Sequence, residues 1–289
     1  MTVVDIIILS KADNDSLFQM NLNCINSLLE SENKDVIKFN IVLIESNKKA
    51  SYKYPKTQII VPDEQFGYNR FLNIGIKYCR GDYHAFCNND LIFHKGWMTA
   101  VLEFSKQYPD CMSFSPIDCK YPTMKEVAEG KHSNWGYMIK YQIAGWCIVV
   151  KKEIFNHINC LFDSKFDFYF ADNDYGLTLL KNNVKHSLIS NSIVDHLHGQ
   201  STSIEDKKNY LLELSEGSYP KYLFKEEYEW ITTNYRMLHD YLLFYNKWGS
   251  SKSLYWKYKL FKKFVFLRHK WITKIVYSIR FSVTLLIVC

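Results

Sequence analysis

Short apolar runs alternate with amphipathic segments up to about residue 204. Residues 3–9 and 37–44 are almost entirely apolar, which is typical of strands buried on both faces of a sheet. Residues 16–30 instead repeat apolar side chains at helical spacing. The pattern predicts strands at residues 3–9, 37–44, 58–61, 83–87, 111–116, 143–150 and 187–196, and helices at residues 16–30, 71–78, 96–107, 152–158 and 172–182.

Strands and helices that alternate in this way are typical of an α/β fold, with a mostly parallel sheet and helices on both faces. Residues 117–140 are polar and rich in Lys, Gly and Tyr, so we expect a mobile loop or lid there. After about residue 204 the pattern becomes helical and aromatic. The sequence therefore predicts a large α/β domain over residues 1–204 and a C-terminal helical extension over residues 205–289.

Polar clusters follow several of the predicted strands. They are residues 10–14, residues 45–47, residues 88–90, and residues 172–174 together with His196 and His198. Ligands of open α/β sheets bind outside the carboxyl ends of the strands, so these clusters are expected to meet at one crevice. Asp90 is well placed to hold a divalent cation between two phosphates, because hard cations take oxygen ligands.

Each cluster also has a purely structural interpretation. Asn and Asp side chains stabilise turns, so residues 88–90 are compatible with a simple turn. Asp172 is suited to capping the helix that it precedes. A lone histidine is more often a core residue than a ligand. Carboxylates and histidines at several strand ends of one sheet nevertheless favour the functional interpretation.

The order of these segments resembles that of the family 2 glycosyltransferases, which have the GT-A fold. The resemblance covers residues 3 to about 202 and rests on eight segments. They are the first strand with Ser10, then Glu45-Ser46-Asn47, residues 66–76 with Asn69, Asn88-Asn89-Asp90 in place of Asp-x-Asp, residues 145–155, Phe162-Asp163, residues 171–177 in place of Glu-Asp-x-Asp-Leu, and residues 196–201 in place of His-x-x-Gly-x-Ser. Each segment alone is a weak signal, and their common order makes the resemblance specific.

The resemblance implies an inverting transfer of a sugar from a nucleotide-diphosphate donor to a hydroxyl of a glycan acceptor. Asp172 is then the base that takes the acceptor proton. Asp90 holds Mn²⁺ or Mg²⁺ at the diphosphate, with His196, or alternatively His198, as a further ligand. The other implied contacts are Ser10, Glu45, Asn69, Asn88 and Asn89 with the donor, and Gly145, Trp146 and Asp174 with the acceptor or sugar. Trp146 is equally suited to a place in the core, and Asp174 to the charge at a helix start.

The chain departs from the family pattern at the metal motif and beside the base. Only Asp90 of residues 88–90 is a carboxylate, so metal affinity should be lower than with two carboxylates. Ala171 replaces the usual Glu next to Asp172. Two alternatives therefore stay open. One is a degenerate, non-catalytic protein that binds nucleotide sugars at a membrane. The other is a nucleotidyltransferase-like enzyme, although residues 10–14 lack the glycines that its phosphate loop needs.

Basic residues concentrate at the end of the chain. The net charge is +6, yet residues 241–289 contain ten Lys or Arg and no Asp or Glu. Residues 250–289 place these cations opposite apolar side chains, with Trp and Tyr between, which predicts an amphipathic helix on an anionic membrane surface. A basic helix packed on the body is the alternative. No nucleic-acid motif accompanies the tail, so we expect no nucleic-acid partner. Binding to a membrane surface would suit a lipid-linked acceptor used in the synthesis of a cell-surface polysaccharide.

The cysteine pattern indicates a reducing compartment. The eight cysteines are scattered, and several lie in apolar strands as free buried thiols do. They form no CxxC pair, so we expect no zinc site. The first residues have no basic flank and only a short apolar run, so we expect no signal peptide. Together these features predict a cytoplasmic protein, peripheral at the inner face of the membrane.

Overall fold

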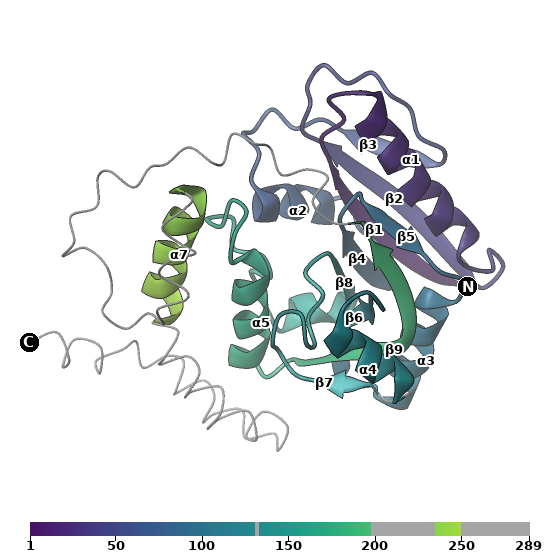
Figure 1. Cartoon of the computed structure of the whole chain (residues 1–289), viewed down its shortest axis with the longest axis vertical. Coiled ribbons are helices and arrows are strands. Elements are labelled where there is room, and N and C mark those ends of the chain that lie inside the picture. The colour runs from purple at the N-terminus through teal and green to yellow at the C-terminus, as the bar shows by residue number, and fades with distance from the viewer. Residues whose placement is uncertain (131–132, 198–234, 250–289) are drawn as a thin grey trace, which may run out of the picture.

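The computed structural model describes residues 1–130, 133–197 and 235–249 (Figure 1). This part of the chain folds around one nine-stranded sheet, in the order β3-β2-β1-β4-β8-β6-β9-β5, with β7 paired to β9. The strands are β1 (Thr2–Ser10), β2 (Ile37–Glu45), β3 (Thr57–Ile60), β4 (Tyr83–Cys87), β5 (Leu91–Phe93), β6 (Cys111–Ile117), β7 (Asn134–Trp135), β8 (Cys147–Lys151) and β9 (Lys185–His196).

Most strands run in one direction, as expected for a GT-A sheet. The pairs β1–β2, β2–β3, β1–β4 and β6–β9 are parallel. β8 lies antiparallel between β4 and β6, and β5 and β7 each run antiparallel to β9. Because β8 is reversed, its first residue pairs with the last residue of β4, Cys147 with Cys87. The chain entering β8 therefore lies at the same edge as the chain leaving β4.

Helices cover both faces of the sheet (Figure 1). They are α1 (Asp15–Glu30), α2 (Tyr68–Ile76), α3 (Trp97–Gln107), α4 (Pro122–Glu129), the 3₁₀ helix η1 (Lys152–Asn156), α5 (Ala171–Lys181) and α7 (Tyr235–Trp248). Apolar residues of α1, α3 and α4 pack on one face, and those of α2, η1, α5 and α7 pack on the other. The sheet is thus the middle layer of three.

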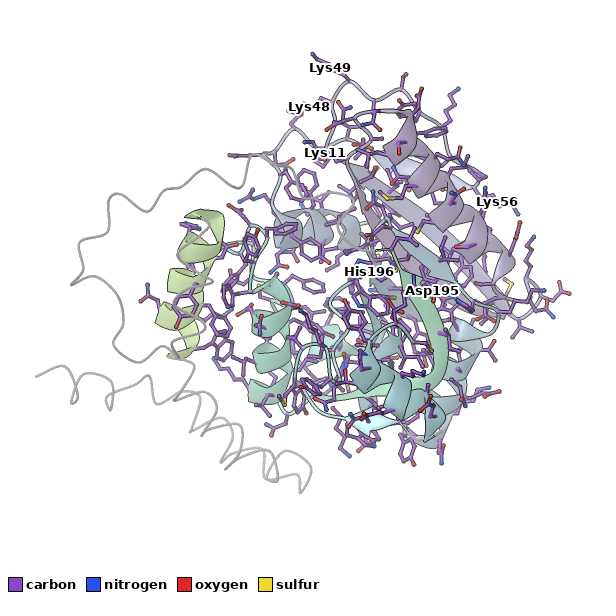
Figure 2. All side chains as sticks on the ribbon, viewed as in Figure 1. Lys11, Lys48, Lys49, Lys56, Asp195 and His196 are labelled. Atoms are coloured by element: carbon purple, nitrogen blue, oxygen red, sulfur yellow. The ribbon has the colours of Figure 1, made fainter. Side chains whose placement is uncertain are left out.

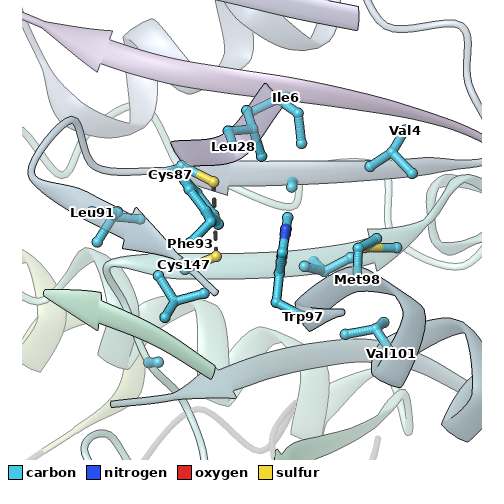
Figure 3. Packing of buried hydrophobic residues seen from close by; sticks show 14 of the residues in the cluster. Val4, Ile6, Leu28, Cys87, Leu91, Phe93, Trp97, Met98, Val101 and Cys147 are labelled. Carbon is cyan, nitrogen blue, oxygen red and sulfur yellow. Dashed lines mark hydrogen bonds between the residues drawn. The ribbon is translucent and has the colours of Figure 1, made fainter. Parts of the chain in front are cut away.

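The apolar run of β1 explains why the sheet is covered twice. Successive side chains of a strand point to opposite faces. Ile6 and Ile8 therefore join the core under α1 and α3, whereas Ile7 joins the core under α2 and α5. Figure 3 shows the first of these cores, where Trp97 and Met98 of α3 lie beneath the strands. From Val4 to Ser10 both faces of β1 are buried, which matches the sequence prediction of a strand without polar alternation.

Three sequence predictions need correction. Residues 117–140 are not one polar loop, because α4 and β7 lie within them and Met124 and Val127 are buried in the core. The strand predicted over residues 143–150 begins only at Cys147. Asp172 does not cap α5 from outside, because the helix already includes Ala171. The domain boundary at 204/205 and the tail over residues 250–289 lie outside the described residues. No helix in the described ranges is long and apolar enough to cross a membrane.

Candidate active site

Asp90 and His196 meet just beyond the end of β4. The short strand β5 pairs Leu91 with His196 of β9, and Leu197 N–H donates to the Asp90 carbonyl at 2.9 Å. This pairing holds Asp90 Oδ1 3.3 Å from His196 Nε2, with both side chains largely buried. Asp90 Oδ1 accepts no hydrogen bond from the residues that the structure describes. Figure 2 shows His196 next to Asp195 near the middle of the view, at the end of β9.

A second carboxylate, which sequence reasoning missed, lies next to this pair. Asp118 directly follows β6 and is fully buried. Its Oδ2 accepts the His196 backbone N–H at 3.2 Å, and its Oδ1 accepts the Lys120 N–H at 2.8 Å. The signal that could have identified it is its place, since it follows a predicted strand as Asp90 follows β4. Asp118 fixes the backbone from which the His196 side chain projects.

The chain before β8 connects this corner to the sheet. Trp146 is 6% exposed, and its ring stacks on His196 at 5.5 Å between centroids. The Trp146 carbonyl accepts the Asn88 N–H at 2.9 Å. The Tyr68 hydroxyl lies 3.3 Å from Asn88 Oδ1 and 3.2 Å from the Gly145 carbonyl, so it can donate to either. Tyr68 begins α2 and is a further residue that the sequence analysis did not single out.

Asp172 lies against Gly145 at the same edge. A Cβ built on Gly145 would stand 2.8 Å from Asp172 Oδ2, so only glycine leaves room for this carboxylate. The Asn173 N–H donates to Asp172 Oδ1 at 2.9 Å. Burial nevertheless raises the pKa of the Asp172 carboxyl above its ordinary value, because desolvation penalises the charged form. A carboxyl with a raised pKa in a partly buried position is suited to accepting a proton.

Helix α7 holds the loop that leads to Asp172. Asp240 of α7 is buried, and its Oδ2 accepts the backbone N–H groups of Phe168 and Tyr169 at 3.0 and 2.8 Å. Phe170 then turns the chain with a φ of 57°, a conformation that non-glycine residues rarely adopt. Figure 1 shows α7 alongside α5, on the side away from the sheet. The structure thus ties α7 directly to the start of α5.

Asp174, predicted to contact the acceptor or to charge the helix start, lies in the first turn of α5 and has partners on α7. It is 1% exposed, and its Oδ1 lies 2.7 Å from Lys247 Nζ and accepts from Trp248 Nε1 at 2.7 Å. Burial raises the pKa of Asp174 despite this ion pair. Lys247 also donates to Asp163 Oδ2 at 2.8 Å. The Asp163 and Asp174 charges raise the pKa of Lys247, although its burial acts in the opposite direction.

A buried polar network occupies the proposed nucleotide side. Glu45 Oε2 accepts from the Ser10 hydroxyl at 2.6 Å, and Ser10 Oγ accepts from Asn21 Nδ2 at 2.7 Å. Asn21 Oδ1 in turn accepts from Asn89 Nδ2 at 2.6 Å. The ends of β2, β1 and β4 are therefore joined through Asn21 of α1, which the sequence analysis did not identify. Because Glu45 also accepts the Ala12 N–H, the network sets the shape of the loop after β1.

Asn69 is, with Asn88, one of two predicted donor residues that lie outside this network. It is buried in α2, and its Nδ2 donates to the Asp163 carbonyl at 3.0 Å. Asn73, one turn later, donates to the Phe162 carbonyl at 2.8 Å. Both amides thus attach α2 to the turn before α5. His198, the alternative metal ligand, lies outside the described residues.

The residues at this edge fit a divalent cation. Asp90 Oδ1 is a buried carboxylate oxygen without a hydrogen-bond donor among the described residues, and it faces a histidine nitrogen at 3.3 Å. Carboxylate and imidazole are suitable ligands for such an ion. The Asn88 and Asn89 side chains are engaged with Tyr68 and Asn21. Among the described residues, Asp90 and His196 would therefore be the two ligands, with phosphate oxygens as further ligands.

A family model matches part of the chain. Residues 20–148 match the model for "Glycosyl transferase family 2". Over these residues the chain is similar to family 2 glycosyltransferases. This match begins in α1 and ends in β8, so it includes the Asn88–Asp90 corner and Gly145. The comparison with curated proteins found no match.

Solved structures agree with the GT-A fold that the sequence predicts. The chain is similar to GalNAc-T7 with UDP, GalNAc and Mn²⁺ at a TM-score of 0.53 and 10% identity, over 68% of this chain and 44% of that one. It is also similar to S. aureus TarS 1-349, at a TM-score of 0.52 and 12% identity, over 67% of this chain and 59% of that one. A third similar structure is the mannosyltransferase PcManGT from Pyrobaculum calidifontis with GDP-Man and Mn²⁺, at a TM-score of 0.50 and 12% identity, over 68% of this chain and 57% of that one. The chain spans about half the length of these proteins.

Proposed function

We propose that this protein is an inverting glycosyltransferase, which moves a sugar from a nucleotide-diphosphate donor to a hydroxyl of a glycan acceptor. The observation that carries the proposal is the arrangement at the carboxyl edge of β4. Asp172, whose pKa is raised by burial, lies against Gly145, and the next residue, Trp146, stacks on His196 beside Asp90. A base and a candidate diphosphate-binding corner therefore share one edge of a domain that is similar to family 2 glycosyltransferases.

In the proposed reaction, Asp172 takes the proton of the acceptor hydroxyl as that oxygen attacks the anomeric carbon. The attack comes from the face opposite the leaving diphosphate, which inverts the configuration. A divalent cation, when bound by Asp90 and His196, would offset the charge that develops on the diphosphate. Mn²⁺ in the structures of GalNAc-T7 and PcManGT supports this choice of ion. The Glu45–Ser10–Asn21–Asn89 network shapes the loops that would receive the nucleoside.

We propose a lipid-linked acceptor in the synthesis of a cell-surface polysaccharide. The support is the composition of residues 250–289, where basic and aromatic residues suit an anionic membrane surface. The protein would then act in the cytoplasm at the inner face of the membrane. Flotation of the full chain and of a chain ending at residue 249 with anionic vesicles tests this part. Equal flotation of both would overturn the membrane proposal.

The release of nucleoside diphosphate from a panel of nucleotide sugars tests the enzyme proposal. With the active donor and an acceptor extract, Asp172→Asn should abolish turnover while donor affinity stays within a few-fold of the unmodified protein. Asp110→Asn is the matched control, because Asp110 pairs with Lys185 at the start of β6 and β9, away from the proposed site. Near-normal turnover of Asp172→Asn would overturn the assignment of the base. Full activity in excess EDTA would remove the cation from the mechanism.

A further inference from the structure

A second cluster of metal-ligating side chains lies towards the amino-terminal ends of β1 and β4, away from the proposed catalytic residues. Asp5 lies in β1 and His84 in β4, next to each other in the register, and Cys79 follows α2. One ligand atom from each of the three residues lies within 4.8 Å of the other two. In the described ranges this is the one trio of His, Cys, Asp or Glu that meets this distance. All three side chains are buried, at 2%, 4% and 6% exposure for Asp5, His84 and Cys79.

The Asp5 carboxylate is fixed by the turn between α2 and β4. Its Oδ2 accepts the backbone N–H groups of Arg80 at 2.6 Å and Gly81 at 2.5 Å, and its Oδ1 accepts from Asn40 Nδ2 at 3.0 Å. Oδ2 also lies 3.6 Å from His84 Nε2. A carboxylate that is oriented by donors in this way is positioned before any ion binds.

His84 supplies the second donor, a buried imidazole. Neither ring nitrogen has a hydrogen-bond partner within the part of the chain that the structure describes. The ring packs against Phe155 of η1 at 5.5 Å between centroids. Burial lowers the pKa of His84, which favours the neutral ring, the form that ligates metals. A buried polar group left without a partner is costly, so an ion that engages it would remove an existing penalty.

Cys79 supplies the third donor. In the absence of a metal its thiol donates to the Gly75 carbonyl at 3.5 Å. Burial, reinforced by the Asp5 charge, raises its pKa to about 12, so the free side chain is a protonated thiol. A bound transition metal deprotonates a coordinating thiol outright. Metal binding at this cluster would therefore release the Cys79 proton and leave its thiolate as a ligand.

We propose that Asp5, Cys79 and His84 form a buried zinc site, separate from the proposed catalytic edge. A sulfur, nitrogen and oxygen donor set suits Zn²⁺, whereas Mg²⁺ and Mn²⁺ prefer oxygen ligands. The 3.6 Å between Asp5 Oδ2 and His84 Nε2 matches one edge of a zinc tetrahedron, for which bonds of about 2.0–2.1 Å give about 3.4 Å. Water would complete the fourth position. The site would link β1, β4 and the chain that follows α2, so its role would be to stabilise this end of the two strands.

The full chain, stripped with a chelator, dialysed and reloaded with Zn²⁺, tests the proposal through its metal content by mass spectrometry. About one zinc ion per chain should remain after gel filtration. Cys79→Ser should lose this ion. Asp90→Asn, which removes the ligand at the other edge, and Cys160→Ser, which removes an exposed thiol, should both keep it. No retained zinc in the unmodified chain, or equal retention in Cys79→Ser, would overturn the proposal.

Cobalt substitution keeps the test decisive if Cys79→Ser fails to fold. The unmodified chain reloaded with Co²⁺ should show a thiolate-to-cobalt charge-transfer band and tetrahedral d–d bands. Excess Zn²⁺ should remove both, because Zn²⁺ has no such transitions. A cobalt complex that lacks the thiolate band would overturn the assignment of Cys79. Neither measurement involves sugar transfer, so the result is independent of the proposed function.

Discussion

The hydrogen bonds of Asp240 predict that α7 sets the position of the proposed base. Asp240→Asn keeps the shape of the side chain but replaces the charged carboxylate, which accepts hydrogen bonds from the N–H groups of Phe168 and Tyr169, with a neutral amide. A hydrogen bond to a charged group contributes about 1.5–3 kcal/mol and one to a neutral group about 1 kcal/mol. The two bonds together should therefore weaken by about 1–4 kcal/mol. The weakened segment leads directly to Asp172, three residues after Tyr169.

Steady-state kinetics of Asp240→Asn should show a lower kcat with little change in the KM for the donor. If about 1.4 kcal/mol of the loss reaches the transition state, kcat falls about tenfold. The donor-side network is built from α1 and the ends of β1, β2 and β4, which α7 does not contact through Asp240. The acidic limb of the pH profile should also move to lower pH. Burial raises the pKa of Asp172, and a loosened loop admits water and lowers that pKa again.

Asn246→Ala is the matched control, because Asn246 lies exposed on the same helix. It should leave kcat, the pH profile and the melting temperature unchanged. A chain ending at residue 234 should lose activity, whereas one ending at residue 249 keeps α7. The reasoning would be refuted by an Asp240→Asn variant with a lower melting temperature but an unaltered kcat and pH profile. In that case α7 would stabilise the fold without positioning the base.

Three further predictions concern single contacts. Gly145→Ala should lower kcat much more than stability, because its Cβ would stand 2.8 Å from Asp172 Oδ2, and unchanged kinetics would contradict the close approach. Asn88→Asp should raise the apparent affinity for Mn²⁺ in activity titrations, since it adds a carboxylate beside Asp90; a weaker response to Mn²⁺ would count against the cation corner. Lys247→Met should lower the melting temperature below about pH 10. Because the folded state raises the Lys247 pKa, the difference in melting temperature between the variant and the unmodified protein should shrink as pH rises through that pKa. A difference in melting temperature that grows over this pH range would contradict the ion pairs of Lys247.

The periodicity of the sequence was sufficient for the main elements of the sheet. Continuous apolar runs gave strands such as β1 and β2, because a strand covered on both faces leaves no polar alternation to confuse the pattern. The reversed strand β8 could not be read in the same way, since its direction depends on partners far away in the chain. The polar character of residues 117–140 likewise concealed α4, whose short apolar stripe is buried only by tertiary packing.

The candidate site was predictable where chemistry follows a strand directly, and less so where tertiary contacts decide. Asp90 and His196 were identified from their positions at strand ends, and the structure brings them together. Asp118 also follows a strand but belongs to none of the sequence motifs on which the resemblance rests. The roles of Asp240 and Lys247 could not be predicted, because both depend on how α7 docks against α5 from more than sixty residues away. The same holds for Asp5, Cys79 and His84, which no CxxC spacing connects.

The buried thiols of Cys87 and Cys147 make the junction of β4 and β8 a natural reporter of local opening. Their sulfur atoms lie 3.7 Å apart, where β4 ends and β8 begins (Figure 3). Cys87 and Cys147 are 1% and 0% exposed. Burial holds the pKa of Cys87 well above its ordinary range, so a thiol reagent can react only when the strands separate. The rate of labelling at these two positions therefore measures how often the sheet opens at the site, without any engineered probe. A bound donor would register as protection of this pair, while the exposed Cys160 would continue to react.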